Sequence, residues 1–195
     1  MADLLTLINA IPDAQDGNVI TANYHNTIKK ALVAIANQLG TAPGAQTVNL
    51  TVQPNFITVG GGTAWSVSLG IATSAVGSNG FISLNLPDGA VIQQMVAMGS
   101  QTNPASKGFA SLLALPLSGT ASTTLIQIDL STGGSPFTLT GSPSPTVSGL
   151  TAAALANMLT VQNSQFKYAI QAEVLGAGVQ INALQIVFAA AAKSA

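Results

Sequence analysis

The amino-acid sequence predicts a mainly β protein in which an N-terminal helical arm, residues 1–40, precedes an antiparallel β-sandwich, residues 41–195. Apolar side chains recur at three- and four-residue spacing within residues 21–40, as they do on one face of a helix. From residue 41 onward, short runs alternate apolar and polar side chains, which is typical of strands with one buried face. Glycine, serine, threonine and proline separate these runs, as turns require.

The helical arm is expected to hold two helices. A short apolar helix around Leu4–Ile8 should end at Pro12, because proline has no amide hydrogen and restricts the residue before it. Thr21 is a good N-cap for the second helix, and Gly40 is a typical stop. The apolar stripe of the second helix consists of Tyr24, Ile28, Leu32, Ile35 and Leu39. Such a stripe has to be covered by another surface.

Eight strands are expected after the arm. They cover residues 48–53, 65–71, 81–86, 90–98, 109–117, 123–130, 166–175 and 179–190. Pro87 and Gly89 favour a tight turn, so residues 86–90 are expected to close a hairpin. Residues 141–158 form a long excursion rich in small and polar residues, with a short helix expected over residues 150–158.

Five large aromatic residues are expected in the core of the sandwich. They are Phe56, Trp65, Phe81, Phe109 and Tyr168. Exposed aromatic rings could stack on sugars, but most of these residues occupy strand positions where a sandwich core favours large side chains.

The composition excludes several classes of function. Charged residues make up 6% of the chain, the formal net charge is -1, and the lysines are scattered without any arginine. Clustered positive charge for nucleic acid or an anionic membrane is therefore not expected. The N-terminus lacks the basic region of a signal peptide, and no apolar stretch reaches the roughly 20 residues that span a bilayer, so we expect synthesis in the cytoplasm. A nearly neutral surface favours self-association.

The sequence offers no motif for catalysis or metal binding, so no enzymatic activity, no cofactor and no metal ion are expected. The chain has no cysteine and one histidine, His25, which cannot complete a zinc site and is expected to be structural. The acidic turn at residues 13–18 lacks the spacing of a calcium-binding loop. Gly60–Gly62 precede a strand and not a helix, so they are expected to form a loop that cradles no phosphate.

Two stretches resemble parts of known virion proteins. Ile11–Thr21, with Asn23–Asn26 and the helix to Gly40, resembles the leader of many tailed-bacteriophage virion proteins. Leu86–Ile92, residues 109–117 and residues 167–188 are similar to jelly-roll-like domains of virion surface proteins, which often assemble as trimers. The chain is short and has no repeats, unlike long fibres and spikes.

The resemblance implies a capsid decoration, or cement, protein. Such a protein binds the outer surface of the bacteriophage capsid and stabilises it, here as a homotrimer whose partner is the major capsid protein. Its location would be the capsid surface of the virion, after synthesis in the host cytoplasm. Tyr24, Ile28, Leu32, Ile35 and Leu39 become the candidate capsid or inter-subunit contacts.

Two alternatives remain open at the level of sequence. The first is a short head or tail fibre, a host-recognition module whose sandwich binds a cell-surface glycan through exposed aromatic side chains. The second is a carbohydrate-active enzyme on a jelly-roll scaffold, which would need two carboxylates such as Asp88 and Asp129 to converge in a cleft.

Overall fold

The computed structural model describes residues 27–28, 30–32, 46–119 and 121–190. Gln46–Ala192 form one compact unit, the β-sandwich. In the N-terminal part, Thr27, Ile28 and residues 30–32 are helical. The predicted first helix, the acidic turn and His25 lie outside the described residues, as does the predicted boundary between residues 40 and 41, so the arm stays a prediction.

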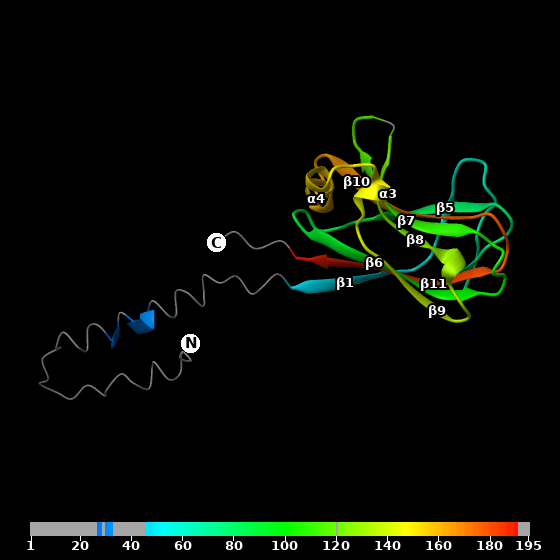
Figure 1. Cartoon of the computed structure of the whole chain (residues 1–195), viewed down its shortest axis with the longest axis horizontal. Coiled ribbons are helices and arrows are strands. Elements are labelled where there is room, and N and C mark those ends of the chain that lie inside the picture. The colour runs from blue at the N-terminus through cyan, green and yellow to red at the C-terminus, as the bar shows by residue number, and fades with distance from the viewer. Residues whose placement is uncertain (1–26, 29, 33–45, 120, 191–195) are drawn as a thin grey trace, which may run out of the picture. The chain divides into compact units, whose positions relative to one another are not determined.

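The sandwich consists of two antiparallel sheets. Sheet A has six strands: β3 (Ser66–Ser68), β4 (Ile71–Thr73), β11 (Val179–Ala189), β6 (Val91–Gln101) and β9 (Phe137–Gly141) in that order, with β1 (Thr47–Val52) also pairing with β11. Sheet B has five strands in the order β2 (Ile57–Thr58), β5 (Ser78–Leu84), β10 (Phe166–Val174), β7 (Gly108–Pro116) and β8 (Thr123–Asp129). Figure 1 shows sheet B stacked above sheet A.

The strand order is that of a jelly roll. Strands β4-β11-β6-β9 face strands β5-β10-β7-β8, and from β4 to β11 the chain changes sheet at every connection except the β7–β8 hairpin. Eight strands in two packed sheets with these crossings are the jelly-roll arrangement. The expected mainly β sandwich is therefore confirmed.

The core lies between the two sheets, where alternate residues of each strand meet. Tyr168 and Ile170 of β10 and Leu184 and Ile186 of β11 are fully buried, while Lys167, Glu173 and the other intervening residues of these strands point outward or lie less buried. The alternation predicted for the two C-terminal strands is thus confirmed. Each such buried side chain contributes about 1.5–3 kcal/mol through removal of apolar area from water.

Two helices lie in the connection between β9 and β10, namely α3 (Pro145–Ser148) and α4 (Ala152–Leu159). Thr151 caps α4, because its hydroxyl accepts a hydrogen bond from the Ala154 amide at 3.2 Å. Strands β6 and β8, which belong to different sheets, both contact α4, and Leu155 of α4 is buried in the core. The helix predicted over residues 150–158 is confirmed, and it covers the gap between the sheets. No helix in the described part of the chain is long and apolar enough to cross a membrane.

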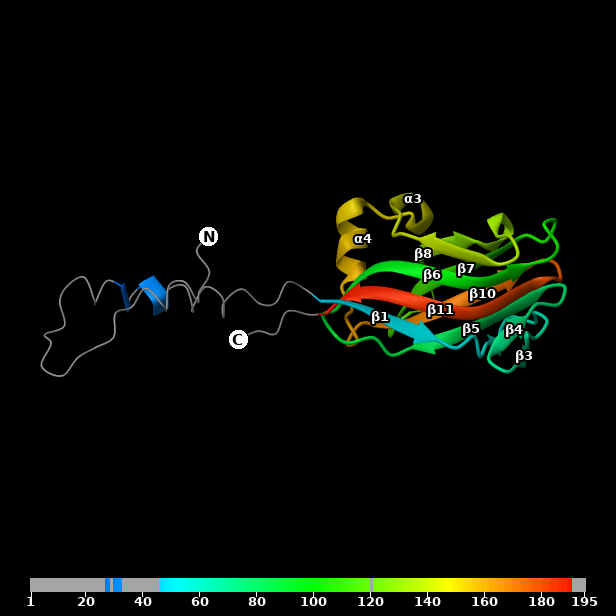
Figure 2. The same ribbon diagram turned by 90° about the horizontal axis from the view of Figure 1, so that it is seen from below.

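The strand predicted over residues 65–71 is wrong. The run splits into the β3–β4 hairpin, whose turn is formed by Leu69 and Gly70 with φ of 51° and 78°. Glycine adopts such left-handed values easily, whereas leucine rarely does. Trp65 is buried as predicted, but Leu69 is 100% exposed and Val67 is exposed as well. Figure 2 shows this hairpin and α4 at opposite ends of the sandwich.

Other predicted boundaries need smaller corrections. Residues 86–90 do contain a turn, since the Ala90 amide donates to the Pro87 carbonyl at 3.2 Å, but β5 and β6 belong to different sheets and form no hairpin. Gly60–Gly62 form the expected loop. Strands β2 and β9 and the short 3-10 helix η1 (Leu130–Thr132) were not predicted.

Candidate functional site

The outer face of sheet B carries most of the sandwich's charged side chains. Asp129 ends β8, and Lys167 and Glu173 project from β10, whereas Asp88 and Lys107 lie in connections. The register aligns Phe109 of β7 with Asp129 on one side and Glu173 on the other. An aromatic ring therefore stands between two acidic positions on this face.

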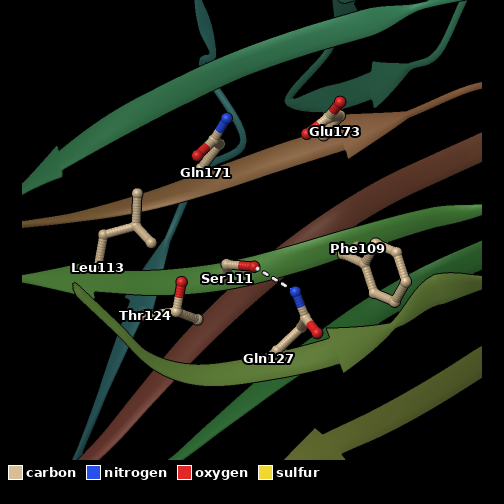
Figure 3. Close-up of a pocket in the computed structure, with 7 residues that line it drawn as sticks. All are labelled: Phe109, Ser111, Leu113, Thr124, Gln127, Gln171 and Glu173. Carbon is tan, nitrogen blue, oxygen red and sulfur yellow. Dashed lines mark hydrogen bonds between the residues drawn. The ribbon is translucent and has the colours of Figure 1, made fainter. Parts of the chain in front are cut away.

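A pocket of about 190 Å³ opens on the same face, lined by residues of three adjacent strands. The lining residues are Phe109, Ser111, Leu113, Thr124, Gln127, Gln171 and Glu173. Ser111 is only 8% exposed although it lies on the outer face. Its short side chain stands among longer neighbours, so it forms the floor and they form the walls. Figure 3 shows β10 residues on one side of β7 and β8 residues on the other.

Hydrogen bonds fix the two glutamine side chains of the pocket. Gln127 Nε2 donates to Ser111 Oγ at 3.4 Å, and Gln171 Nε2 donates to Asn79 Oδ1 of β5 at 2.9 Å. Each amide keeps its oxygen and a second N–H for another partner. Within the described part of the chain, the Glu173 carboxylate has no hydrogen-bonding or ionic partner. The pocket thus presents polar groups that are held in place but still have bonding capacity.

The prediction that Phe109 belongs to the core is wrong. The Phe109 side chain is 42% exposed on the outer face of β7, because the inward positions of that strand are Ala110, Leu112 and Ala114. Phe81 is partly buried and pairs with Gln171, so it also belongs to the outer face. Trp65 and Tyr168 are core residues as predicted, and Phe56 packs against the core.

The outer face of sheet A has the opposite character, and we call it the uncharged face. None of the residues of its six strands, all of which the structure describes, is charged. Two pairs of its polar side chains bond to each other: Gln185 Nε2 donates to Thr51 Oγ1 at 3.1 Å, and Ser100 Oγ donates to Gln180 Oε1 at 3.1 Å. Such a face can be covered by protein without removing a charge from water.

The carboxylates of the enzyme alternative do not come together. Asp88 accepts a hydrogen bond at 2.8 Å from the amide of Asn163, which lies just before the start of β10. Asp129 pairs with Phe109, and Phe109 pairs with Glu173 near the end of β10. Seven residues of strand, about 23 Å at 3.3 Å per residue, separate these two ends. Asp129 also accepts a hydrogen bond from the Ser131 amide at 2.9 Å and so caps η1. This arrangement removes the basis for a hydrolase that uses Asp88 and Asp129.

Tyr168 is the group with a shifted titration in the described part of the chain. Burial raises the pKa of its hydroxyl, a hydrogen bond from the Gln162 amide lowers it, and the negative charge of Asp88 raises it, with burial the largest cause. The hydroxyl is held inside the core and takes no part in the pocket. No group of three or more histidine, aspartate or glutamate side chains gathers among the described residues to hold a metal ion.

Two of the five predicted contact residues of the arm are described. Ile28 and Leu32 are both exposed, at 40% and 59%. Tyr24, Ile35 and Leu39 lie outside the described residues, so the role of the stripe stays a prediction. Sequence patterns missed the pocket, because the wall formed by β10 comes from a part of the chain that β9, α3 and α4 separate from the β7–β8 hairpin.

Comparisons with known proteins give no family for this chain. No family model matches the sequence. No curated protein matches it. Among solved structures, a xylan-binding module, CBM15, is similar with a TM-score of 0.48 and 14% sequence identity, covering 75% of this chain and 100% of that one. Similarity at this level carries no information about what this chain binds.

Proposed function

We propose that this chain is a structural virion protein that binds the outer surface of a bacteriophage capsid as a homotrimer and stabilises it. The observation that supports the proposal best is the contrast between the two faces of the sandwich. The uncharged face of sheet A suits contact with protein, whereas the outer face of sheet B, with Asp129, Lys167 and Glu173, suits contact with water. The resemblance of residues 11–40 to leaders of virion proteins supports the phage assignment.

The size of the uncharged face fits a subunit interface. Strands β1, β11, β6 and β9 have 6, 11, 11 and 5 residues, so at about 3.3 Å per residue and about 4.8 Å between strands they offer roughly 520 Å². A stable interface removes about 800 Å² per partner from solvent, which the edges of such a face can supply. The cross-strand hydrogen bonds of Gln185 and Ser100 mean that covering this face leaves the polar groups of these two pairs bonded.

In this proposal the N-terminal arm attaches the trimer to the shell. Three arms on one trimer act together, because once the first has bound, the others are held near their sites. The stripe of Tyr24, Ile28, Leu32, Ile35 and Leu39 would supply apolar area at about 25 cal/mol per Å², before the cost of ordering the arm. The major capsid protein is the partner.

Removal of the arm tests the attachment. A variant lacking residues 1–40 should keep a β-rich circular dichroism spectrum and should no longer co-sediment with capsids that bind the full chain. If it still decorates capsids with unchanged affinity, attachment belongs to the sandwich. If it fails to fold, the division of the chain is wrong.

A matched pair of charge substitutions tests the trimer. Gln185→Lys places a charge at the centre of the uncharged face, whereas Ser83→Lys places the same charge at an exposed position of β5 in sheet B. Burying an unpaired charge costs several kcal/mol, so Gln185→Lys should dissociate the trimer and Ser83→Lys should not. Sedimentation equilibrium of the 19.5 kDa chain at neutral pH distinguishes the states. A wild-type protein that is monomeric at micromolar concentration contradicts the proposed trimer.

A further inference from the structure

The pocket on sheet B has no role in the attachment or the trimer proposed above. From its geometry, we infer that it binds a neutral saccharide. The inference rests on the lining side chains, their hydrogen bonds and the charge of this face, and it is independent of the capsid assignment.

The first argument is the match between the pocket and a polyhydroxyl ligand. Gln127, Gln171 and Glu173 supply amide and carboxylate groups around the hydroxyls of Ser111 and Thr124. Amides both donate and accept, and carboxylates accept at two oxygens, so this set can bond to neighbouring hydroxyls on one ring. An apolar ligand would cover these polar groups without bonding to them, and leaving them unpaired costs free energy.

The second argument is the exposed ring of Phe109 at one side of these polar groups. A sugar ring has an apolar C–H face as well as hydroxyl edges, and an aromatic side chain provides a flat apolar surface for it. Phe109 and Leu113 of β7 bracket Ser111 on the same face, because they lie two residues on either side of it. Figure 3 shows the phenyl ring at one end of the pocket and the leucine at the other.

The charge of the lining disfavours anionic ligands, which is the third argument. Glu173 is the charged residue of the lining, and Asp129 stands on the far side of Phe109. Lys167 of β10 is six residues from Glu173, about 20 Å along the strand. Lys107, two residues before Phe109, lies outside the lining, so a phosphate, sulfate or carboxylate ligand in the pocket would meet the Glu173 carboxylate directly, whereas a neutral sugar would not be repelled by it.

The fourth argument is the rigidity of the binding groups. The glutamines come from two different strands and are each tied to a neighbour, Gln127 to Ser111 and Gln171 to Asn79. A site built on paired strands loses little conformational entropy when it binds. Across β8, β7 and β10 the polar row spans about 10 Å, which is long enough for a short oligosaccharide. The pocket is smaller than the roughly 300–1,000 Å³ of pockets that enclose drug-sized ligands, so the sugar would lie on the face with one ring in the depression.

The test uses the full-length protein on an array of neutral and anionic glycans, including sialylated and sulfated ones. The affinity for a neutral oligosaccharide that binds is then measured by isothermal titration calorimetry for wild type, Phe109→Ala and Gln171→Ala. Gln162→Ala is the matched control, since the Gln162 side chain also donates one hydrogen bond, to the Asn157 carbonyl at 3.0 Å, and lies outside both the pocket and the uncharged face. Circular dichroism confirms that each variant is folded.

We expect binding to neutral glycans, a loss of at least tenfold in affinity in Phe109→Ala and in Gln171→Ala, and no change in Gln162→Ala. The absence of any neutral glycan among the hits overturns the inference, and so does a preference for anionic glycans. Equal affinity in wild type and both pocket variants also overturns it. Capsid co-sedimentation of the same variants separates the two proposals. If the protein still decorates capsids but its pocket binds no sugar, the saccharide site is refuted and the capsid role is not.

Discussion

Replacing Tyr168 by phenylalanine tests whether one buried hydroxyl fastens the chain after α4 to the core. The Tyr168 side chain is 1% exposed. Its Oη accepts a hydrogen bond from the Gln162 amide at 3.2 Å and donates to the Thr160 carbonyl at 3.5 Å. Both partners lie in the connection between α4 and β10, so the hydroxyl holds this connection against the end of the sandwich.

The expected loss of stability follows from these two contacts. Tyr168→Phe keeps the ring and removes both hydrogen bonds, each of which contributes about 0.5–1.5 kcal/mol, while an unpaired buried donor costs about 1–3 kcal/mol. Gln162 is partly buried, and the 3.5 Å contact lies at the limit of a hydrogen bond, so the lower values apply. We expect a loss of about 1–1.5 kcal/mol in the free energy of unfolding, and a fall of about 3–6 °C in Tm.

The same hydroxyl predicts a pH dependence. Burial raises the pKa of Tyr168 in the folded protein, so the unfolded chain releases this proton at lower pH than the folded one. Its contribution to stability is therefore fully present below the usual tyrosine pKa of about 10 and is lost as the pH rises through the folded-state value. Tyr168→Phe should lack this part of the alkaline loss.

Urea unfolding of wild type and variant, followed by circular dichroism between neutral pH and pH 11, measures both effects. Tyr24→Phe is the control, because Tyr24 is the chain's other tyrosine and lies outside Gln46–Ala192. The argument is refuted if Tyr168→Phe unfolds at the same urea concentration as wild type and loses the same stability above pH 10.

Three further substitutions probe the sandwich, each by its thermal midpoint. Gly99→Ala should destabilise by about 3 kcal/mol or more or prevent folding, because the added Cβ would collide with the Gln180 carbonyl on the paired strand; an unchanged Tm contradicts this. Leu69→Asn should raise the free energy of unfolding by about 1 kcal/mol, because asparagine tolerates the left-handed turn and the Leu69 side chain is fully exposed. A lower Tm would contradict this. Asp129→Ala should lower stability by about 0.5–2 kcal/mol through loss of the cap on η1, and no loss would mean that the bond to the Ser131 amide contributes nothing.

The sequence predicts most of the strands, because the alternation of apolar and polar side chains can be recognised within each strand's own residues. Strands β10 and β11 combine long alternating runs with turns on either side, so their limits and their inward residues are predicted within about two residues. The β3–β4 hairpin is missed because its turn begins with Leu69, an apolar residue that continues the alternation of Trp65 and Val67 and rarely adopts a positive φ. Strands β2 and β9 are too short, at 2 and 5 residues, to give a clear period.

The candidate site depends on pairing between distant strands, which local patterns do not determine. Phe109, Gln127 and Gln171 come together only because β7 pairs with both β8 and β10 in one register. Shifting either strand by one residue would turn its pocket residues inward. The sequence of β7 alone does not show which of its faces is buried, because both faces carry apolar side chains and Phe109 lies on the outer one.

A cryo-EM reconstruction of capsids assembled with and without this protein tests the proposed capsid binding most directly. We expect extra density at three-fold positions on the outer surface of the shell, into which three sandwiches fit. In that fit, the uncharged faces of sheet A should meet one another and the pockets of sheet B should face outward. Identical maps with and without the protein, or density in which the charged faces of sheet B form the subunit contacts, would contradict it.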